Sequence, residues 1–391
     1  MPRYMERIGA LKIYDVQKVL ELSGGRSSKP TGELPGIINL GRNELEDIES
    51  RMAIIVPVKN DNPKVLEGVL SGIPHEALVI IVSNSSRDHI DLYRVETDIV
   101  FQFYRLTHRP LVMIHQKDPV WSDALTEAGY PYLLGSDGLV RDGKGEGMVL
   151  GLLLAKAMGR EYVGFVDADN YIPGAVNEYV DVYATAFYMA RSKYAMVRIK
   201  WPYKTKFVGK RFYFRRRGRV SEITNKYMNM LIARITRFET DIIKTSCSGE
   251  HAMTMELAER IGYAGGFAIE SYEYVYMLEE YTGVHEPRFK DILKQTIEIY
   301  QIEPRNPHVH EERGDEHLTS MLRTTLSTIY HSELADDELR KRIIDELLSR
   351  GALKHNEDLE PPLKLPPIYG ARTDKMLKTL EASSETLIIA E

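Results

Sequence analysis

Two aspartates, Asp167 and Asp169, directly follow an apolar run at residues 162–166. Bounded by Gly159 and Pro173, this run predicts a short buried strand. Side chains two positions apart on a strand share a face, so both carboxylates can point into one cleft. Two hard oxygen donors suit Mg²⁺ or Mn²⁺, which commonly takes one or two carboxylates and then binds phosphates. An acidic turn without a ligand explains this segment equally well when it is taken alone.

A second pair of candidate ligands is formed by His308 and His310. Histidines two apart can present both imidazoles on one face of a strand, as metal ligands or as donors to phosphate. Paired surface histidines without a metal are also common. Beside the two aspartates, this segment fits a C-terminal lid over the same metal site.

A glycine-rich stretch at residues 143–147 contains Lys144. Its spacing fits neither the dinucleotide-binding nor the P-loop motif. It can still place Lys144 and unpaired N–H groups at the start of a helix, where a diphosphate is stabilised. A flexible helix entry is the alternative.

Basic residues cluster between Lys200 and Arg219 in a chain of net charge −6, which suggests an anionic ligand. Gly218, Arg219, Val220 and Ser221 then open a predicted helix with Ser221 as its N-cap. Arg219 beside the positive end of that helix can hold a phosphate or a carboxylate. A solvated basic hairpin is the alternative.

Two glutamates complete the candidate groups. Residues 246–253 predict a small-residue loop that enters a helix, with Glu250 and His251 in its first turn. Residues 265–270 predict a short strand that delivers Glu270 to the cleft.

The elements that must position these residues alternate along the chain. Apolar runs predict strands and periodic segments predict helices, which indicates an α/β fold with a parallel, doubly wound sheet covered by helices on both faces. The predicted strands before the aspartates are 52–56, 77–82 and 111–114, and the predicted helices are 64–70, a stretch through 106, and 144–158. Ligands bind beyond the carboxyl ends of such strands. Each of these strands ends in a polar tetrapeptide: 57–60, 83–86, 115–118 and 167–170.

Three parts of the chain are expected. Residues 1–50 form an N-terminal segment packed on the core, and residues 51–315 form the main domain, with a first half at 51–170 and a second half at 171–315. Residues 316–391 form a helical extension and tail. The later elements expected are a helix at 176–191, a strand at 195–201, helices at 318–331, 336–349 and 373–383, and a proline-rich tether at 359–367.

Composition narrows the functional class. The chain has 391 residues, a net charge of −6 and a pI near 6.1, which gives no reason to expect nucleic-acid or membrane binding. The single cysteine, Cys247, excludes an internal disulfide and a multi-cysteine metal site. No apolar run approaches the roughly 20 residues of a membrane span, and the N-terminus lacks a signal-peptide core, so we expect a cytoplasmic protein. A charged fraction of 28% with few glutamines is typical of thermophile proteins.

Several blocks together resemble the mannosyl-3-phosphoglycerate synthase family: residues 54–57, 66–76, 115–118, 164–171 and 305–313. The resemblance spans roughly residues 5–350, and we expect no match beyond about residue 355. It implies a Rossmann-like glycosyltransferase A-type fold, in which residues 51–170 form the nucleotide-sugar half and residues 171–315 the acceptor half. The implied reaction moves mannose from GDP-mannose to 3-phosphoglycerate with retention, a step in the synthesis of the compatible solute mannosylglycerate.

The resemblance also implies roles for residues in this sequence. Asp167 and Asp169 correspond to the D-x-D motif, with Asp169 the closer metal ligand and His308 or His310 completing the site; His310 is slightly preferred. Mg²⁺ is the expected ion, with Mn²⁺, Co²⁺ or Zn²⁺ as alternatives. The nucleotide sugar is expected to contact Pro57, Val58, Lys59, Asn60, Ser85, Gln116, Lys117, Asp118, Lys144, Asp167 and Ala168. Residues 218–221 are similar to the Gly-Arg-Val-Thr segment with which glucosyl-3-phosphoglycerate synthases hold their acceptor, with Ser221 in place of the threonine.

The catalytic group is expected to consist of Asp167, Asp169, Glu250 and Glu270, with the two glutamates contacting the sugar. Departure of the leaving group places negative charge on the diphosphate, which a divalent ion stabilises as a Lewis acid. Retention needs a carboxylate nucleophile, as in retaining glycosidases, or attack by the acceptor hydroxyl on the same face. No carboxylate is marked as a nucleophile, so same-face attack is favoured.

Other functions remain open from the sequence. A glucosyl-3-phosphoglycerate synthase would share these motifs. A haloacid-dehalogenase-type phosphatase also has D-x-D after a strand, but Tyr171 replaces the Thr or Val that it needs. A sugar nucleotidyltransferase would show a glycine-rich signature near the first strand. A non-catalytic nucleotide-sugar sensor would not need both the acidic pair and the basic stretch. A homodimer is compatible with the sequence.

Overall fold

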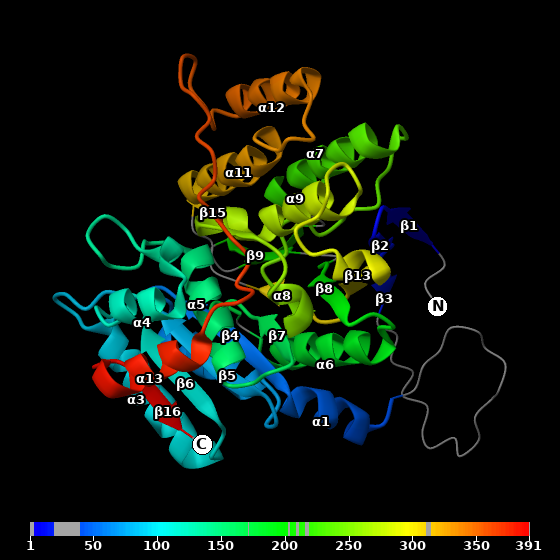
Figure 1. Ribbon diagram of the computed structural model, residues 1–391. Coiled ribbons are helices and arrows are strands. Elements are labelled where there is room, and N and C mark those ends of the chain that lie inside the picture. The colour runs from blue at the N-terminus through cyan, green and yellow to red at the C-terminus, as the bar shows by residue number, and fades with distance from the viewer. Residues whose placement is uncertain are drawn as a thin grey trace.

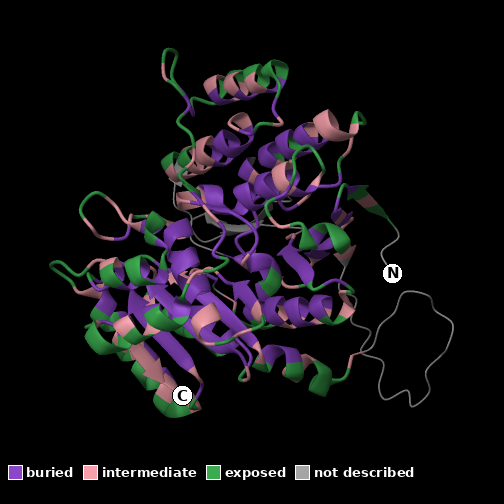
Figure 2. Ribbon diagram, viewed as in Figure 1, coloured by how far each residue is buried: buried purple, intermediate pink, exposed green. Residues whose placement is uncertain are grey.

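A computed structural model describes residues 4–18, 40–170, 172–201, 204–208, 211–215, 219–309 and 314–390. They include an 11-stranded sheet, most of whose strands are buried between helices (Figures 1 and 2). One half of the sheet contains β7 (Tyr162–Phe165), β4 (Met52–Val58), β5 (Leu78–Ser83) and β6 (Leu111–His115), in this order and all parallel. The expected alternation of strands and helices is therefore confirmed for this half.

The parallel strands read as continuous apolar runs because both of their faces are covered. Along β4, Ile54 packs into the core on one side of the sheet and Ile55 into the core on the other. The helices on the Ile54 side are α1 (Arg42–Ser50), α2 (Pro63–Gly72), α3 (Leu92–Thr107) and α6 (Pro173–Met189). The Ile55 side carries α4 (Trp121–Ala128) and α5 (Lys144–Ala157).

The other half of the sheet is mixed. It continues from β7 through β11 (His251–Thr254), β8 (Tyr194–Ile199), β13 (Ile297–Glu303) and β2 (Leu11–Tyr14) to β1 (Met5–Ile8), and β3 (Gln17–Lys18) also pairs with β13. β11 runs antiparallel to both of its neighbours. In this half, the face of the sheet on the Ile55 side is covered by α7 (Arg219–Thr236) and α9 (Ile269–Tyr281).

Three local predictions are wrong here. Residues 251–254 form a strand and not a helix, because β7 and β8 pair with their backbone on both sides. Glu270 is delivered by the first turn of α9, after the short helix η2 (Gly266–Ala268), and not by a strand. α7 already begins at Arg219, so Ser221 lies inside its first turn and is not its N-cap.

The C-terminal part of the chain crosses the molecule. α11 (Gly314–Tyr330) and α12 (Asp337–Ser349) lie at one end, and α13 (Thr373–Ser383) lies beside α4 at the other (Figure 1). β16 (Ile388–Ala390) then pairs with β6 and forms the edge of the large sheet. The sheet thus takes strands from both segments that flank the expected main domain.

The remaining elements are small. β9 (Lys204–Val208) pairs with β10 (Arg211–Arg215) and with β14 (His308–Val309), and β12 (Tyr263–Ala264) pairs with β15 (Lys364–Leu365). Short helices are η1 (Pro131–Leu133), α8 (Met255–Ala258) and α10 (Asp291–Lys294). Among the described residues, no helix combines the length and the apolar character needed to cross a membrane.

Packing of α2 against α6 predicts opposite effects for two glycines. A Cβ at Gly72 would overlap the backbone oxygen of Pro173 and crowd Val176, whereas a Cβ at Gly174 meets nothing within 4 Å. Gly72→Ala should lower the free energy of unfolding by about 1–3 kcal/mol. Gly174→Ala should leave it unchanged or raise it by up to about 1 kcal/mol. Urea unfolding of both variants measures this, and equal stabilities would contradict the close approach of the two helices.

Candidate active site

The ends of β4, β5 and β6 are joined by hydrogen bonds at one edge of the sheet. The Asn60 N–H donates to Ser85 Oγ at 2.7 Å, and the Ser86 N–H donates to Asn60 Oδ1 at 2.8 Å. The Gln116 N–H donates to the Ser83 oxygen at 2.7 Å. Asn60 has a left-handed backbone with φ of 58°, a conformation that asparagine tolerates better than most residues. The polar strand ends predicted from the sequence therefore form one surface.

Side chains of the turn after β6 hold the loop that leads into α5. Gln116 Nε2 donates to the backbone oxygens of Arg141 at 2.7 Å and Gly143 at 3.3 Å. Lys117 Nζ donates to the Val140 oxygen at 2.5 Å. The start of α5 is thereby fixed against the strand ends, next to β7.

Lys144, the first residue of α5, links two of the predicted catalytic carboxylates. Its Nζ lies 2.7 Å from Asp167 Oδ1 and 2.9 Å from Glu270 Oε1. Burial opposes the charged amine, but the two carboxylates outweigh it and raise the pKa of Lys144. Gly249 lines this contact, and a Cβ there would lie 2.7 Å from Asp167 Oδ2 and 3.1 Å from Lys144 Nζ.

Asn170, which follows the D-x-D pair, connects Glu250 with His308. Its Nδ2 donates to the backbone oxygen of Asp167 at 2.8 Å and to Glu250 Oε1 at 2.9 Å. Its Oδ1 lies 3.2 Å from His308 Nδ1 and accepts a hydrogen bond from this ring nitrogen. The imidazole also stacks on Trp201 with ring centroids 4.3 Å apart. These two contacts hold the His308 ring in one orientation.

Glu250 is buried beside these groups. Burial, and secondarily the negative charge of Asp167, raises the pKa of Glu250 to about 8. At neutral pH and without a bound cation, this carboxyl is mainly protonated and neutral.

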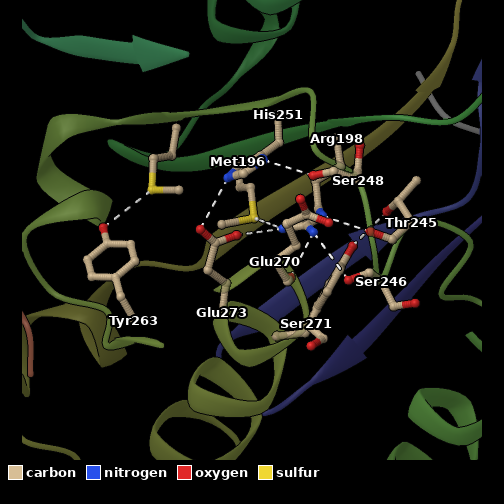
Figure 3. A network of polar contacts seen from close by, with 12 residues as sticks. Met196, Arg198, Thr245, Ser246, Ser248, His251, Tyr263, Glu270, Ser271 and Glu273 are labelled. Atoms are coloured by element: carbon tan, nitrogen blue, oxygen red, sulfur yellow. Dashed lines mark hydrogen bonds and ion pairs between the residues drawn. The ribbon is translucent and has the colours of Figure 1, made fainter. Parts of the chain in front are cut away.

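A network of buried charges lies beneath the site (Figure 3). Arg198 of β8 donates to Glu273 Oε2 at 2.7 Å and to the backbone oxygen of Glu270 at 2.8 Å, and Glu273 Oε1 lies 3.1 Å from His251 Nε2. His251 Nδ1 faces the Ser248 oxygen at 2.9 Å, so both ring nitrogens face acceptors. Burial by itself would raise the pKa of Glu273, but His251 and Arg198 hold it below its ordinary value. The network fixes both the loop that carries Glu250 and the first turn of α9 that carries Glu270.

The structure brings most of the predicted residues to one edge, with differences in exposure and bonding. Lys59 and Asn60 are exposed, Pro57, Lys117, Asp167 and Asp169 are partly buried, and Val58, Ser85, Gln116 and Ala168 are buried. His310 and Gly218 lie outside the described residues, as does the side chain of Arg219, while Val220 and Ser221 lie in the first turn of α7.

Asp118 differs most from its expected role of contacting the nucleotide sugar. It is buried, and both of its carboxylate oxygens accept hydrogen bonds within the protein, from the Val120 N–H and from Ser384 and Thr386 of the tail. Its carboxylate therefore fastens the tail at the strand ends.

Several residues of the site escaped the sequence analysis. Asn170, Trp201, Arg198 and Glu273 were not singled out, although a charged Arg198 within an otherwise apolar strand is a usable signal of a buried partner. The partner itself, Glu273, comes from a distant helix and has no local signature.

Comparison with known proteins now decides the family. The sequence model of the family described as mannosyl-3-phosphoglycerate synthase matches residues 1–380. The chain belongs to this family. A mannosyl-3-phosphoglycerate synthase from Pyrococcus furiosus is 48% identical over 391 residues, 99% of this chain and 98% of the relative. Another from Aeropyrum pernix is 44% identical over 363 residues, 93% of this chain and 91% of the relative.

The fold is shared with more distant solved structures. Crystal structures of glucosyl-3-phosphoglycerate synthase from Mycobacterium tuberculosis superpose with TM-scores of 0.50 and 0.51 at 19% and 18% sequence identity, each covering 77% of this chain and 86% of theirs. The expected A-type glycosyltransferase fold is thus confirmed.

Family membership answers the question of activity that the motifs left open. As a mannosyl-3-phosphoglycerate synthase, the protein is a glycosyltransferase that transfers a mannosyl group from a nucleotide sugar to 3-phosphoglycerate. The phosphatase and sensor alternatives are set aside. The expectation of no match beyond about residue 355 is wrong, because the Pyrococcus relative aligns with 99% of the chain.

The raised pKa of Glu250 predicts a specific pH dependence of stability. The pKa of Glu250 in the folded protein, about 8, lies above the ordinary carboxyl value. The proton on Glu250 therefore stabilises the fold fully when the pH is below that ordinary value, and this stabilisation is lost as the pH rises from there to about 8. Without metal, the wild type should lose unfolding free energy relative to Glu250→Gln by up to about 1.4 kcal/mol per pH unit across that window. Urea titrations at several pH values measure this. Glu67→Gln, at an exposed position of α2, is the control, and parallel curves for wild type and Glu250→Gln would contradict the prediction.

Proposed function

We propose that the nucleotide sugar is GDP-mannose, that a divalent metal assists the transfer, and that the transfer retains the configuration at the anomeric carbon. The choice of donor rests on the resemblance to the family. The observation that carries the site assignment is the contact of Lys144 with both Asp167 and Glu270 at the joined ends of the parallel strands. Ligands of open α/β sheets bind at this edge.

The proposed donor site uses both the strand ends and the start of α5. The nucleotide part lies against Lys59, Asn60, Gln116 and Lys117, and the diphosphate lies near Lys144. The N-terminus of α5 adds backbone N–H groups and the positive end of the helix dipole, which stabilise phosphate oxygens. The buried Ser85 supports Asn60 from below.

The residues fit a divalent ion that binds together with the diphosphate. Asp167 and Asp169 supply hard oxygen ligands, and His308 is linked to the Asp167 backbone through Asn170. Among the described residues, no three His, Cys, Asp or Glu side chains already form a metal-holding cluster, so phosphate oxygens would supply part of the coordination. The bound ion would supply Lewis-acid stabilisation of the departing diphosphate. The Mycobacterium tuberculosis enzyme of the same fold was crystallised with Mn²⁺ and UDP and with Mg²⁺ and UDP, which supports a divalent ion.

The state of the two glutamates bears on which route to the proposed retention is used. Glu250 is buried and mainly protonated, and the carboxylate of Glu270 is held in an ion pair with Lys144. Neither side chain therefore offers a free carboxylate as a nucleophile. We therefore favour attack by the acceptor hydroxyl on the face that the diphosphate leaves. The new C–O bond forms as the bond to the diphosphate breaks, and the hydroxyl proton passes to a diphosphate oxygen. Lys144 stabilises the charge that develops there.

The proposed acceptor site lies at the start of α7. Gly218, Arg219, Val220 and Ser221 occupy or precede its first turn, where the helix dipole favours an anion. Arg219 would pair with the phosphate or the carboxylate of 3-phosphoglycerate.

A matrix of donors and acceptors tests the function as a whole. GDP-mannose, GDP-glucose, UDP-glucose and UDP-mannose would each be incubated with 3-phosphoglycerate, 2-phosphoglycerate and glycerate. Product mass identifies the transfer, and the anomeric coupling in the NMR spectrum gives the stereochemistry. Turnover should be highest with GDP-mannose and 3-phosphoglycerate and should give the α-configured product. Inversion, or preference for a uridine donor, would overturn the corresponding part of the proposal.

Asp169 should control metal binding directly. Asp169→Asn keeps the shape of the side chain but removes one charge, so Mn²⁺ affinity in the presence of GDP should fall about tenfold or more, together with turnover. Electron paramagnetic resonance of free Mn²⁺ measures the binding without relying on activity. Asp98→Asn, on the exposed side of α3, is the control and should bind Mn²⁺ as the wild type does. Undiminished Mn²⁺ affinity in Asp169→Asn would remove Asp169 from the metal site.

Arg219 should affect the acceptor alone. Loss of a charge-assisted hydrogen-bond pair costs about 1.5–3 kcal/mol, or roughly one to two powers of ten in affinity. Arg219→Ala should raise the KM for 3-phosphoglycerate by that factor and leave GDP binding nearly unchanged. Arg234→Ala is the matched control, because Arg234 lies near the other end of α7 and pairs with Asp336. A matched loss of donor affinity in Arg219→Ala would show that Arg219 is not the acceptor clamp.

A further inference from the structure

The C-terminal segment after α13 reaches the same strand end as the proposed donor site. It runs from Ser384 to β16, which pairs antiparallel with β6 in the register Ile388 to Met113 and Ala390 to Leu111. β6 ends at His115, immediately before the turn that carries Gln116 and Lys117. The tail is thus an edge strand placed beside the strand that presents two donor-site residues.

Thr386, together with Ser384, joins the tail to this turn. It is 5% exposed, and its Oγ1 donates to Asp118 Oδ2 at 2.5 Å and accepts from the His115 N–H at 3.2 Å. Its backbone oxygen accepts from the hydroxyl of Tyr93 at 2.6 Å, and Ser384 Oγ donates to Asp118 Oδ2 at 2.7 Å. Thr386 therefore bonds to the residues on both sides of Gln116 and Lys117.

Further hydrogen bonds connect the turn with the residues of the proposed donor site. The Lys117 N–H donates to His115 Nδ1 at 3.1 Å, which leaves the ring proton on Nε2 to donate to the Ser85 oxygen at 2.9 Å. Gln116 in turn holds the backbone of Gly143, directly before Lys144. A continuous set of hydrogen bonds thus joins the tail to the base of the donor site.

We propose that Thr386 and Asp118 are positioning residues for the nucleotide sugar. They hold the turn at residues 115–118 in the geometry in which Gln116 and Lys117 meet the donor. Neither residue touches the substrate in this proposal, which rests on the proposed donor site. The acceptor side is outside the set, because α7 and the first turn of α9 make none of these bonds.

The test compares Thr386→Val with Thr386→Ser and with Thr379→Val. Valine keeps the shape but removes both side-chain hydrogen bonds, while serine restores the hydroxyl. Thr379 is the matched control, because its hydroxyl joins α13, which directly precedes the tail, to Glu127 of α4 at the surface, away from the turn. GDP binding by calorimetry and the KM values for both substrates would be measured well below the melting temperature of each variant.

Thr386→Val should weaken GDP binding and raise the KM for GDP-mannose about fivefold, with the KM for 3-phosphoglycerate unchanged. Thr386→Ser and Thr379→Val should behave like the wild type. Equal loss for donor and acceptor, or no rescue by serine, would overturn the proposal in favour of a general stabilising role.

Gln116→Leu, measured in the same way, separates this inference from the donor site on which it rests. If Gln116→Leu weakens GDP binding and Thr386→Val does not, the positioning role fails while the donor site stands. If neither changes GDP binding, the donor site itself is misplaced and the positioning role fails with it.

Discussion

Charge balance at the end of β7 is the constraint on which the rest of the site depends. Asp167, Asp169, Glu250 and Glu270 approach one another there, and carboxylates in so small a volume cannot all be ionised without a cation. The protein meets this with the ammonium group of Lys144 between Asp167 and Glu270, and with a neutral Glu250. Such a group is already arranged to accept an additional cation together with an anionic ligand. The electrostatics therefore match a reaction whose leaving group is a diphosphate.

Positioning of these carboxylates comes from buried polar groups rather than from the sheet alone. Arg198 holds the first turn of α9 by donating to the backbone oxygen of Glu270, and His251 holds the loop before Glu250. Removing one partner of such a pair leaves the other charge buried without compensation, which lowers the free energy of unfolding by about 3–5 kcal/mol. The same hydrogen bonds thus stabilise the fold and position Glu250 and Glu270. Movement of either glutamate requires disruption of several of these bonds at once.

The two halves of the sheet contribute different parts of the site. Parallel strands β4 to β7 supply the donor edge, because their carboxyl ends all open to one side. The antiparallel β11 brings the Glu250 loop back to the same edge from the opposite direction, since its N-terminal end lies beside the C-terminal end of β7. One antiparallel strand in an otherwise parallel neighbourhood is therefore what allows residues far apart in the chain to face the same ligand.

The sequence by itself determined the alternating strands, the polar strand ends and the D-x-D pair, because each depends on local periodicity or on adjacent residues. Motif resemblance gave the family, which the comparisons confirm. Only the tertiary structure decided that residues 251–254 form a strand, since both-sided pairing overrode a local pattern that favoured a helix. The same holds for Lys144 between Asp167 and Glu270, for Asn170 between Glu250 and His308, and for the seating of Thr386 on Asp118. These contacts join residues tens to hundreds of positions apart, and such pairings leave no periodic signal in a single sequence.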